Sequence, residues 1–173
     1  MSGKTFVMKW TRKSEFILPH DDDITKIIVS TPPHSVASIT VLNLNGNSVT
    51  NLKNAWKLKN VREVLFQNCD LDFVPNWVES LPCLQYIYLD NNNLEELPNW
   101  LITLQNLERV DLQGNPLERI PAFHYLRMIK IGKSDIPGLP YDFFHHQLKS
   151  VWICDNKGIC HNLLMVSLSY FDN

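Results

Sequence analysis

Glycine is scarce in this sequence, and its scarcity excludes one class of binding site. Only 6 of the 173 residues are glycine, and these are not clustered. The chain therefore has no glycine-rich loop of the kind that holds the phosphates of a nucleotide. It also lacks the HExxH pattern of zinc proteases and the motifs that surround catalytic nucleophiles. The adjacent His145 and His146 are interpreted as a surface pair, so we predict that the protein is not an enzyme.

A strong excess of charge is absent as well. The 16 Lys and Arg against 18 Asp and Glu give a net charge of −2, so nothing favours direct binding of nucleic acid or of an anionic membrane. The first 19 residues contain no long apolar run, because Lys4, Lys9, Arg12 and Lys13 interrupt it. We therefore expect no signal peptide and no membrane-spanning helix, and a cytoplasmic protein, with the nucleus as the alternative.

Four cysteines are present, namely Cys69, Cys83, Cys154 and Cys160. Without a secretory signal, reduced thiols are expected rather than a disulfide framework. Cys154, Cys160 and the neighbouring His161 do not have the spacing of a zinc knuckle, and no second pair accompanies them. We predict neither a metal nor an organic cofactor, and a Cys154–Cys160 disulfide remains an alternative.

The centre of the chain contains a repeat of 23 residues, seen by comparing the segments that begin at Leu84 and at Leu107. Both read L-x-x-φ-x-L-x-x-N-x-L-x-x-φ-P, where φ is Ile, Leu or Val. The apolar residues at positions one, four and six lie on one side of a short extended segment. The Asn at position nine bonds to backbone groups of the bend that follows. One such loop cannot bury its apolar edge, but stacked loops can, and this pattern is typical of leucine-rich repeats.

Further copies of the pattern extend the repeats over residues 39–158, giving about six in all. The other copies begin at Ile39, Val61, Leu126 and Leu148. The copy at Val61 has Cys69 in place of the Asn, and we expect this cysteine to be buried in the same ladder. The copy at Leu126 begins only 19 residues after Leu107, so its outer side has lost about one helical turn.

The two ends of the chain do not follow the repeat, and we predict that they cap it. Within residues 1–38, the stretches 5–10 and 15–18 are expected to be short strands. Residues 24–29 match the first half of a repeat and are expected to be a degenerate repeat strand. The apolar segment 159–173 is expected to cover the last repeat, because an uncapped solenoid exposes an apolar edge. Residues 1–173 are then a single domain.

Residues 39–158 resemble the leucine-rich repeat family. The segment LPNWLITL at 97–104 is similar to the intracellular repeats of Ras-suppressor and Scribble-type scaffold proteins. The resemblance implies an α/β solenoid, a horseshoe with a concave parallel β-sheet and a mostly irregular or 3₁₀ convex side. Trp77 and Trp100, which recur after Pro-Asn, fall on that convex side and are expected to shield the core. The resemblance also implies a protein that binds other proteins, often as an adaptor or regulatory subunit.

The candidate binding surface follows from the register of the repeats. Positions three and five of each repeat point into the hollow, yet position five carries Leu65, Tyr88 and Trp152 instead of polar residues. Exposed Tyr, Trp and Arg often form binding hot spots, although aromatic side chains on adjacent strands also simply pack together. The predicted partner-binding residues are Leu65, Tyr86, Tyr88, Arg109, Asp111, Lys130 and Trp152.

Charged residues flank this column. A basic cluster is expected from Arg127, Lys130 and Lys133, and an acidic one from Glu108 and Asp111. Together these features predict a non-catalytic adaptor or regulatory subunit, monomeric on its own, that binds a protein on its concave face. The alternative is a structural subunit of a fixed complex such as a ribonucleoprotein.

Overall fold

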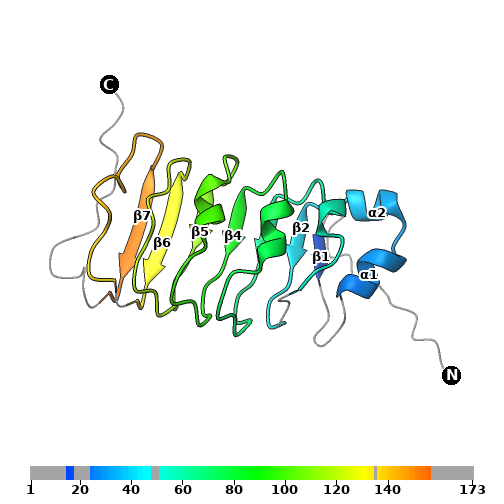
Figure 1. Cartoon of the computed structure of the whole chain (residues 1–173), viewed down its shortest axis with the longest axis horizontal. Helices are drawn as coiled ribbons and strands as arrows, with labels where there is room; N and C mark the ends of the chain where they lie inside the picture. Colours follow the sequence, from blue (N-terminus) through cyan, green and yellow to red (C-terminus); the bar gives the residue numbers. More distant parts are fainter. Residues whose placement is uncertain (1–14, 18–23, 48–50, 135, 157–173) are drawn as a thin grey trace.

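The computed structural model describes residues 15–17, 24–47, 51–134 and 136–156. Its strands form one parallel sheet in which each strand pairs with the next along the chain (Figure 1). The strands are β1 (Glu15–Ile17), β2 (Val41–Asn43), β3 (Glu63–Leu65), β4 (Tyr86–Tyr88), β5 (Arg109–Asp111), β6 (Met128–Gly132) and β7 (Ser150–Cys154). The strands β2 to β7 lie where the repeat pattern predicts them, so the stacked solenoid is confirmed.

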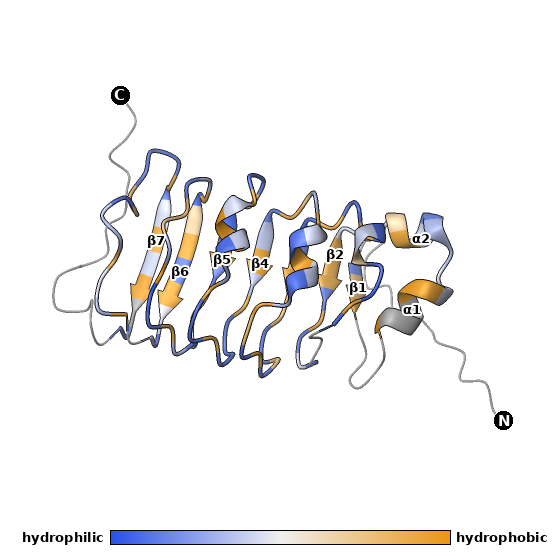
Figure 2. Ribbon diagram, in the orientation of Figure 1, coloured by the Kyte–Doolittle hydropathy of each residue, from blue (hydrophilic) through white to orange (hydrophobic). Residues whose placement is uncertain are grey.

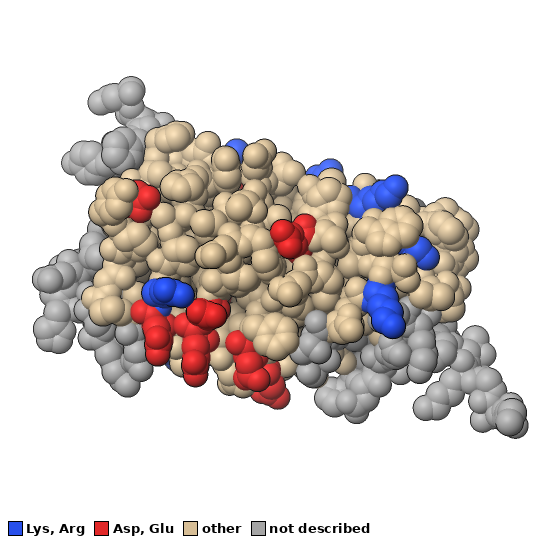
Figure 3. Space-filling view, in the orientation of Figure 1, with Lys and Arg blue, Asp and Glu red and all other residues tan. Residues whose placement is uncertain are grey.

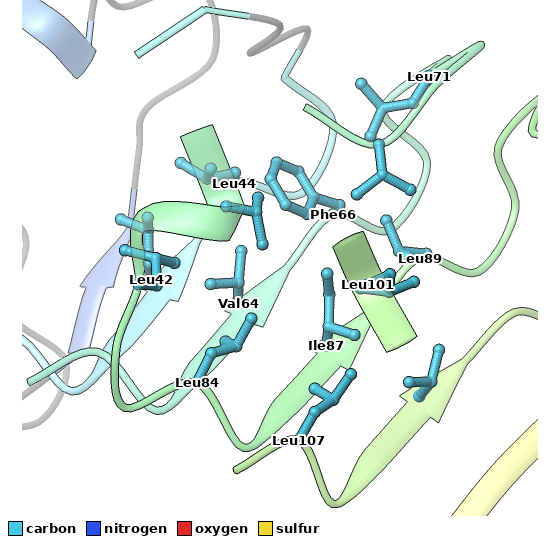
Figure 4. Packing of buried hydrophobic residues seen from close by; sticks show 14 of the residues in the cluster. Leu42, Leu44, Val64, Phe66, Leu71, Leu84, Ile87, Leu89, Leu101 and Leu107 are labelled. Atoms are coloured by element: carbon cyan, nitrogen blue, oxygen red, sulfur yellow. The ribbon is translucent and has the colours of Figure 1, made fainter. Parts of the chain in front are cut away.

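In each strand from β2 to β6, the residue at position four of the repeat anchors the core. These residues lie directly opposite one another from strand to strand and are 0% exposed; they are Leu42, Val64, Ile87, Val110 and Ile129. Their β-branched members favour extended backbone. In Figure 4, Ile87 and Leu89 point toward Leu101 of the opposite segment, which closes the same repeat. The segments that join the elements alternate hydrophilic and hydrophobic residues (Figure 2), and their apolar residues, such as Leu71 and Leu94, are buried in the core.

The side of the solenoid opposite the sheet is built from short 3₁₀ segments, η1 (Ala55–Lys57), η2 (Asn76–Ser80) and η3 (Asn99–Thr103). Within η2, Trp77 is 9% exposed and its ring centroid lies 5.6 Å from that of Phe66. The indole N–H of Trp100 donates to Asn76 Oδ1 of the preceding repeat at 3.3 Å. Trp77 is thus part of the core, and Trp100 links two repeats.

The position-nine residues form the predicted ladder. The Asn92 amide donates to the carbonyls of Phe66 (2.7 Å) and Leu89 (2.8 Å). Its oxygen accepts from the backbone N–H groups of Cys69 (3.0 Å) and Leu71 (3.1 Å). One buried side chain therefore satisfies four backbone groups in two successive repeats.

Cys69 is buried in this ladder, as predicted, and is a free thiol. Its Sγ donates to the Leu44 carbonyl at 3.1 Å, which corresponds to the bond from Asn92 to Phe66 one repeat later. Burial raises the pKa of the Cys69 thiol, the largest of several effects on it. The thiol therefore stays protonated and keeps its donor at neutral pH.

The prediction of a degenerate repeat strand at residues 24–29 is wrong. Residues Ile24–Ser30 form helix α1, which is followed by α2 (Pro33–Ala37). Ile24 and Ile28, four residues apart, are both buried, whereas Val29 is 57% exposed, and this is a helical period. The sheet instead begins with β1, where Phe16 is buried opposite Leu42.

Three predicted features lie outside the described residues. They are the strand at 5–10, the C-terminal cap at 159–173 and the pairing of Cys154 with Cys160.

Candidate functional site

The predicted binding residues lie on one face of the sheet, in two adjacent columns. We call this the open sheet face, defined by positions three and five of the repeats. The fifth-position column runs through neighbouring strands as Asn43, Leu65, Tyr88, Asp111, Lys130 and Trp152. The third-position column runs as Val41, Glu63, Tyr86, Arg109, Met128 and Ser150. The structure therefore brings all seven predicted residues onto the same surface.

An ion pair occupies the middle of the open sheet face. Lys130 Nζ lies 3.0 Å from Asp111 Oδ2, and the Asp111 side chain is only 6% exposed. Asp111 Oδ1 also accepts from the Gln113 backbone N–H at 3.4 Å. Asp111 is thus a buried, neutralised carboxylate and is not directly accessible to a partner.

The expected separation into a basic and an acidic cluster is not observed. Arg127 Nε lies 3.8 Å from Glu108 Oε2, parallel to the pair formed by Lys130 with Asp111. Lys133 is exposed after β6, where its φ of 55° places it in the left-handed region. Four of the charged residues on and directly before β5 and β6 therefore pair across the two strands.

Tyr88 is held by two charged neighbours. The guanidinium carbon of Arg109 lies 5.3 Å from the centre of the Tyr88 ring, a cation–π arrangement. The Glu63 carboxylate is hydrogen-bonded to the Tyr88 side chain. Burial raises the pKa of the Tyr88 hydroxyl, with Arg109 opposing and Glu63 reinforcing the shift. Tyr88 therefore remains a neutral donor at physiological pH.

Trp152 is the most exposed aromatic residue of this face, at 50%. Its indole N–H donates to the Ser150 hydroxyl at 3.0 Å, which orients the ring along β7. The pair of Asp111 and Lys130 separates it from Leu65 and Tyr88, which are adjacent in register. The open sheet face thus has two apolar areas with charges between them.

The seventh-position residues border this face with a chain of hydrogen bonds. The Asn45 amide donates to Gln67 Oε1 at 2.9 Å, and the Gln67 amide donates to Asp90 Oδ1 at 3.0 Å. Asn45 Oδ1 accepts from the Gln67 backbone N–H at 2.7 Å. These contacts fix three side chains, so the border of the open sheet face is ordered by its own bonds.

A groove of about 350 Å³ lies at the edge where the strands begin, and the sequence interpretation did not identify it. Its lining includes Gln85, Glu108, Tyr125, Arg127, His146 and Lys149. The short spacing of 19 residues between the starts of the fourth and fifth repeats is the sequence feature that could have predicted this groove. The short outer segment there leaves His146 and Tyr125 beside the strand starts.

The side of the molecule that carries the 3₁₀ segments has a different charge distribution. Carboxylates gather along its lower edge, next to one basic group (Figure 3). The ion pair of Arg119 with Glu96, 3.2 Å long, joins two successive repeats and is fully in solvent, with side chains 79% and 74% exposed. Such a pair contributes little to stability.

Two further features concern only the described part of the chain. Within it, no three His, Cys, Asp or Glu side chains gather as a metal site. None of its helices has the length and apolar character needed to cross a membrane.

Comparison with known proteins agrees with this geometry. A family model described as Leucine Rich Repeat matches residues 83–104, which include β4. No curated protein matches the chain. A solved leucine-rich repeat protein of Leptospira interrogans is similar with a TM-score of 0.59 at 22% identity, over 79% of this chain and 40% of that one.

The crystal structure of the TLR13–ssRNA13 complex is similar with a TM-score of 0.52 at 17% identity, over 75% of this chain and 25% of that one. At these identities the likeness shows the fold alone. The chain spans less than half the length of either of these proteins.

Proposed function

Because the chain folds as a leucine-rich repeat solenoid, we propose that it is a non-catalytic protein-interaction module, an adaptor or regulatory subunit whose partner binds the open sheet face. Repeat solenoids of this kind generally serve protein–protein interaction, since their stacked strands offer an extended surface. The observation that carries the proposal is the exposure of Trp152 in register with Tyr88 on that surface.

The aromatic residues of the two sides differ in their setting. On the outer side, Trp77 is buried against Phe66, while Trp56 of η1 is 59% exposed with the Lys57 ammonium 5.9 Å from its ring centre. On the open sheet face, Tyr86, Tyr88 and Arg109 remain partly exposed in strand backbone that is rigidly paired on both sides. Tyr, Trp and Arg on a rigid surface are the residue types that dominate binding hot spots.

The test compares two double variants against a partner captured from a lysate of the source cell. Tyr88→Ala with Trp152→Ala should weaken binding by about 2 kcal/mol or more while the melting temperature changes little. Trp77→Ala with Trp100→Ala should lower the melting temperature. The molecules that remain folded should still bind the partner with unchanged affinity. Calorimetry and thermal melts measure both quantities. If the first variant binds normally and the second does not, the binding face is on the other side.

A further inference from the structure

Arg109 is the cation of the open sheet face that has no ionic partner. The other cation in the two columns, Lys130, is neutralised by Asp111 at 3.0 Å. Among the described residues, no carboxylate lies within ion-pair distance of the Arg109 guanidinium, which rests instead on the Tyr88 ring. The centre of this face therefore presents one positive charge without an ion-pair partner, because the Glu63 carboxylate, two strands away in the same column, bonds to Tyr88 instead.

The hydrogen bonding of the Arg109 guanidinium is also incomplete within the described part of the chain. Its Nε is buried and has no acceptor in the described part of the chain. A buried donor without an acceptor costs free energy, and a guanidinium is best satisfied by a carboxylate that accepts two parallel bonds. The fold thus positions Arg109 but leaves its preferred ligand to be supplied from outside.

The neighbours of Arg109 strengthen such a contact. Tyr86 lies directly opposite on β4 and Met128 directly opposite on β6, so Arg109 is flanked in its column by two largely apolar residues. Walls of this kind lower the local dielectric and make a charge-assisted bond stronger than it is in water.

The exposed Trp152 lies two strands beyond Arg109, about 10 Å across the sheet, and two positions further along its strand. The diagonal between them is about 12 Å, which an extended peptide covers in about four residues with both side chains on the same side. Arg109, which can bind an anion, and the aromatic ring of Trp152 therefore lie at a spacing that a single short peptide segment can bridge.

We infer that the open sheet face binds an acidic segment of its protein partner, with an Asp or Glu carboxylate on Arg109 and an apolar side chain about four residues away on Trp152. This inference rests on the proposed function and adds the chemistry of the partner. A nucleic acid suits the face less well, because its backbone requires several unpaired cations in a row and the two columns offer Arg109 alone among the described residues.

The experiment selects ligands without assuming their sequence. A phage-displayed library of random short peptides is panned on the immobilised full chain, and the recovered peptides are synthesised and titrated. Most should contain Asp or Glu with an apolar residue about four positions away. Arg109→Gln should weaken them at least tenfold, and Arg109→Lys by less, because Lys keeps the charge and loses the fork. Arg119→Gln, which removes an exposed Arg outside the two columns, is the matched control and should change nothing.

A second arm pairs each variant with a peptide whose acidic residue is replaced by its amide. If the carboxylate sits on Arg109, the two changes together should weaken binding no more than either alone. Thermal melts of Arg109→Gln and Arg109→Lys establish that both remain folded.

Three results would overturn the inference. Peptides that require Tyr88 and Trp152 but tolerate Arg109→Gln would refute the role of Arg109 and leave the proposed function intact. Peptides that tolerate Tyr88→Ala and Trp152→Ala as well would refute the proposed function too. Tighter binding of a single-stranded oligonucleotide than of any peptide, lost in Arg109→Gln, would replace the protein partner by a nucleic acid.

Discussion

Lys130 lies 3.0 Å from Asp111 across β5 and β6, and this contact makes a buried carboxylate tolerable in the sheet. The Asp111 side chain is 6% exposed and that of Lys130 is 26% exposed. Water therefore has little access to the Asp111 carboxylate and would solvate it poorly if the lysine were removed. The pair thus belongs to the fold as much as to the candidate binding surface.

Removing only the cation should therefore be costly. Lys130→Met leaves the Asp111 charge unpaired, and we expect a loss of about 1–3 kcal/mol in the free energy of unfolding. Adding Asp111→Asn should recover most of it, because an amide carries no charge into the sheet. Urea melts of the two variants measure this difference, and a harmless Lys130→Met would show that solvent already neutralises Asp111.

The ladder gives a second prediction, since Asn92 and Cys69 occupy the same place in successive repeats. Asn92→Ala leaves the backbone N–H groups of Cys69 and Leu71 without their buried acceptor, and should cost about 1–3 kcal/mol. Cys69→Ala removes a weaker donor and should cost less. Urea melts compare the two, and an equal or larger loss for Cys69→Ala would contradict the ladder roles.

Alanine substitutions at two glycines can separate the cost of a steric contact from the cost of backbone strain. Gly46 and Gly114 follow β2 and β5 at equivalent places, with φ of 70° and 71°. A Cβ at Gly46 meets nothing within 4 Å, whereas one at Gly114 would lie 2.5 Å from Asn91 Oδ1 and 3.3 Å from Asn91 Cα.

Both Ala substitutions thus carry the same strain of about 1 kcal/mol, and Gly114→Ala should carry an additional steric cost of similar size. Thermal melts test the order. Equal losses would mean that the Asn91 loop yields freely to the added methyl group.

The strands and their facing columns could be predicted from the sequence because burial imposes a fixed phase on each repeat. Leu42, Val64 and Ile87 must face the core, and this alone sets which residues face away. Helix α1 was missed because Ile24 and Ile27 satisfy a repeat pattern and a helical period equally well over so few residues.

The charge pairing could not be predicted for a different reason. Position in a column says that Arg109 and Lys130 lie on the same face, but not which neighbour each side chain approaches. Arg127 turns to Glu108 and Lys130 to Asp111, whereas Arg109 rests on Tyr88. These side-chain contacts determine which charge remains available to a partner, and they can be identified only in the three-dimensional structure.

The last prediction separates tryptophans that support the fold from the one assigned to binding. Trp77 is 9% exposed and packs on Phe66 at 5.6 Å between ring centroids, so Trp77→Ala opens a cavity and should cost about 3–5 kcal/mol. Trp152 is 50% exposed, and the one hydrogen bond of its indole to a described residue is to Ser150 of its own strand. Trp152→Ala should therefore cost less than about 1 kcal/mol.

Urea melts of the two single variants give the comparison, with Trp152→Phe as a control that keeps an aromatic ring but loses the bond to Ser150. If Trp152→Ala destabilises the chain as much as Trp77→Ala does, the Trp152 ring is part of the core. The open sheet face would then lose its exposed anchor, and with it the reason to place the partner there.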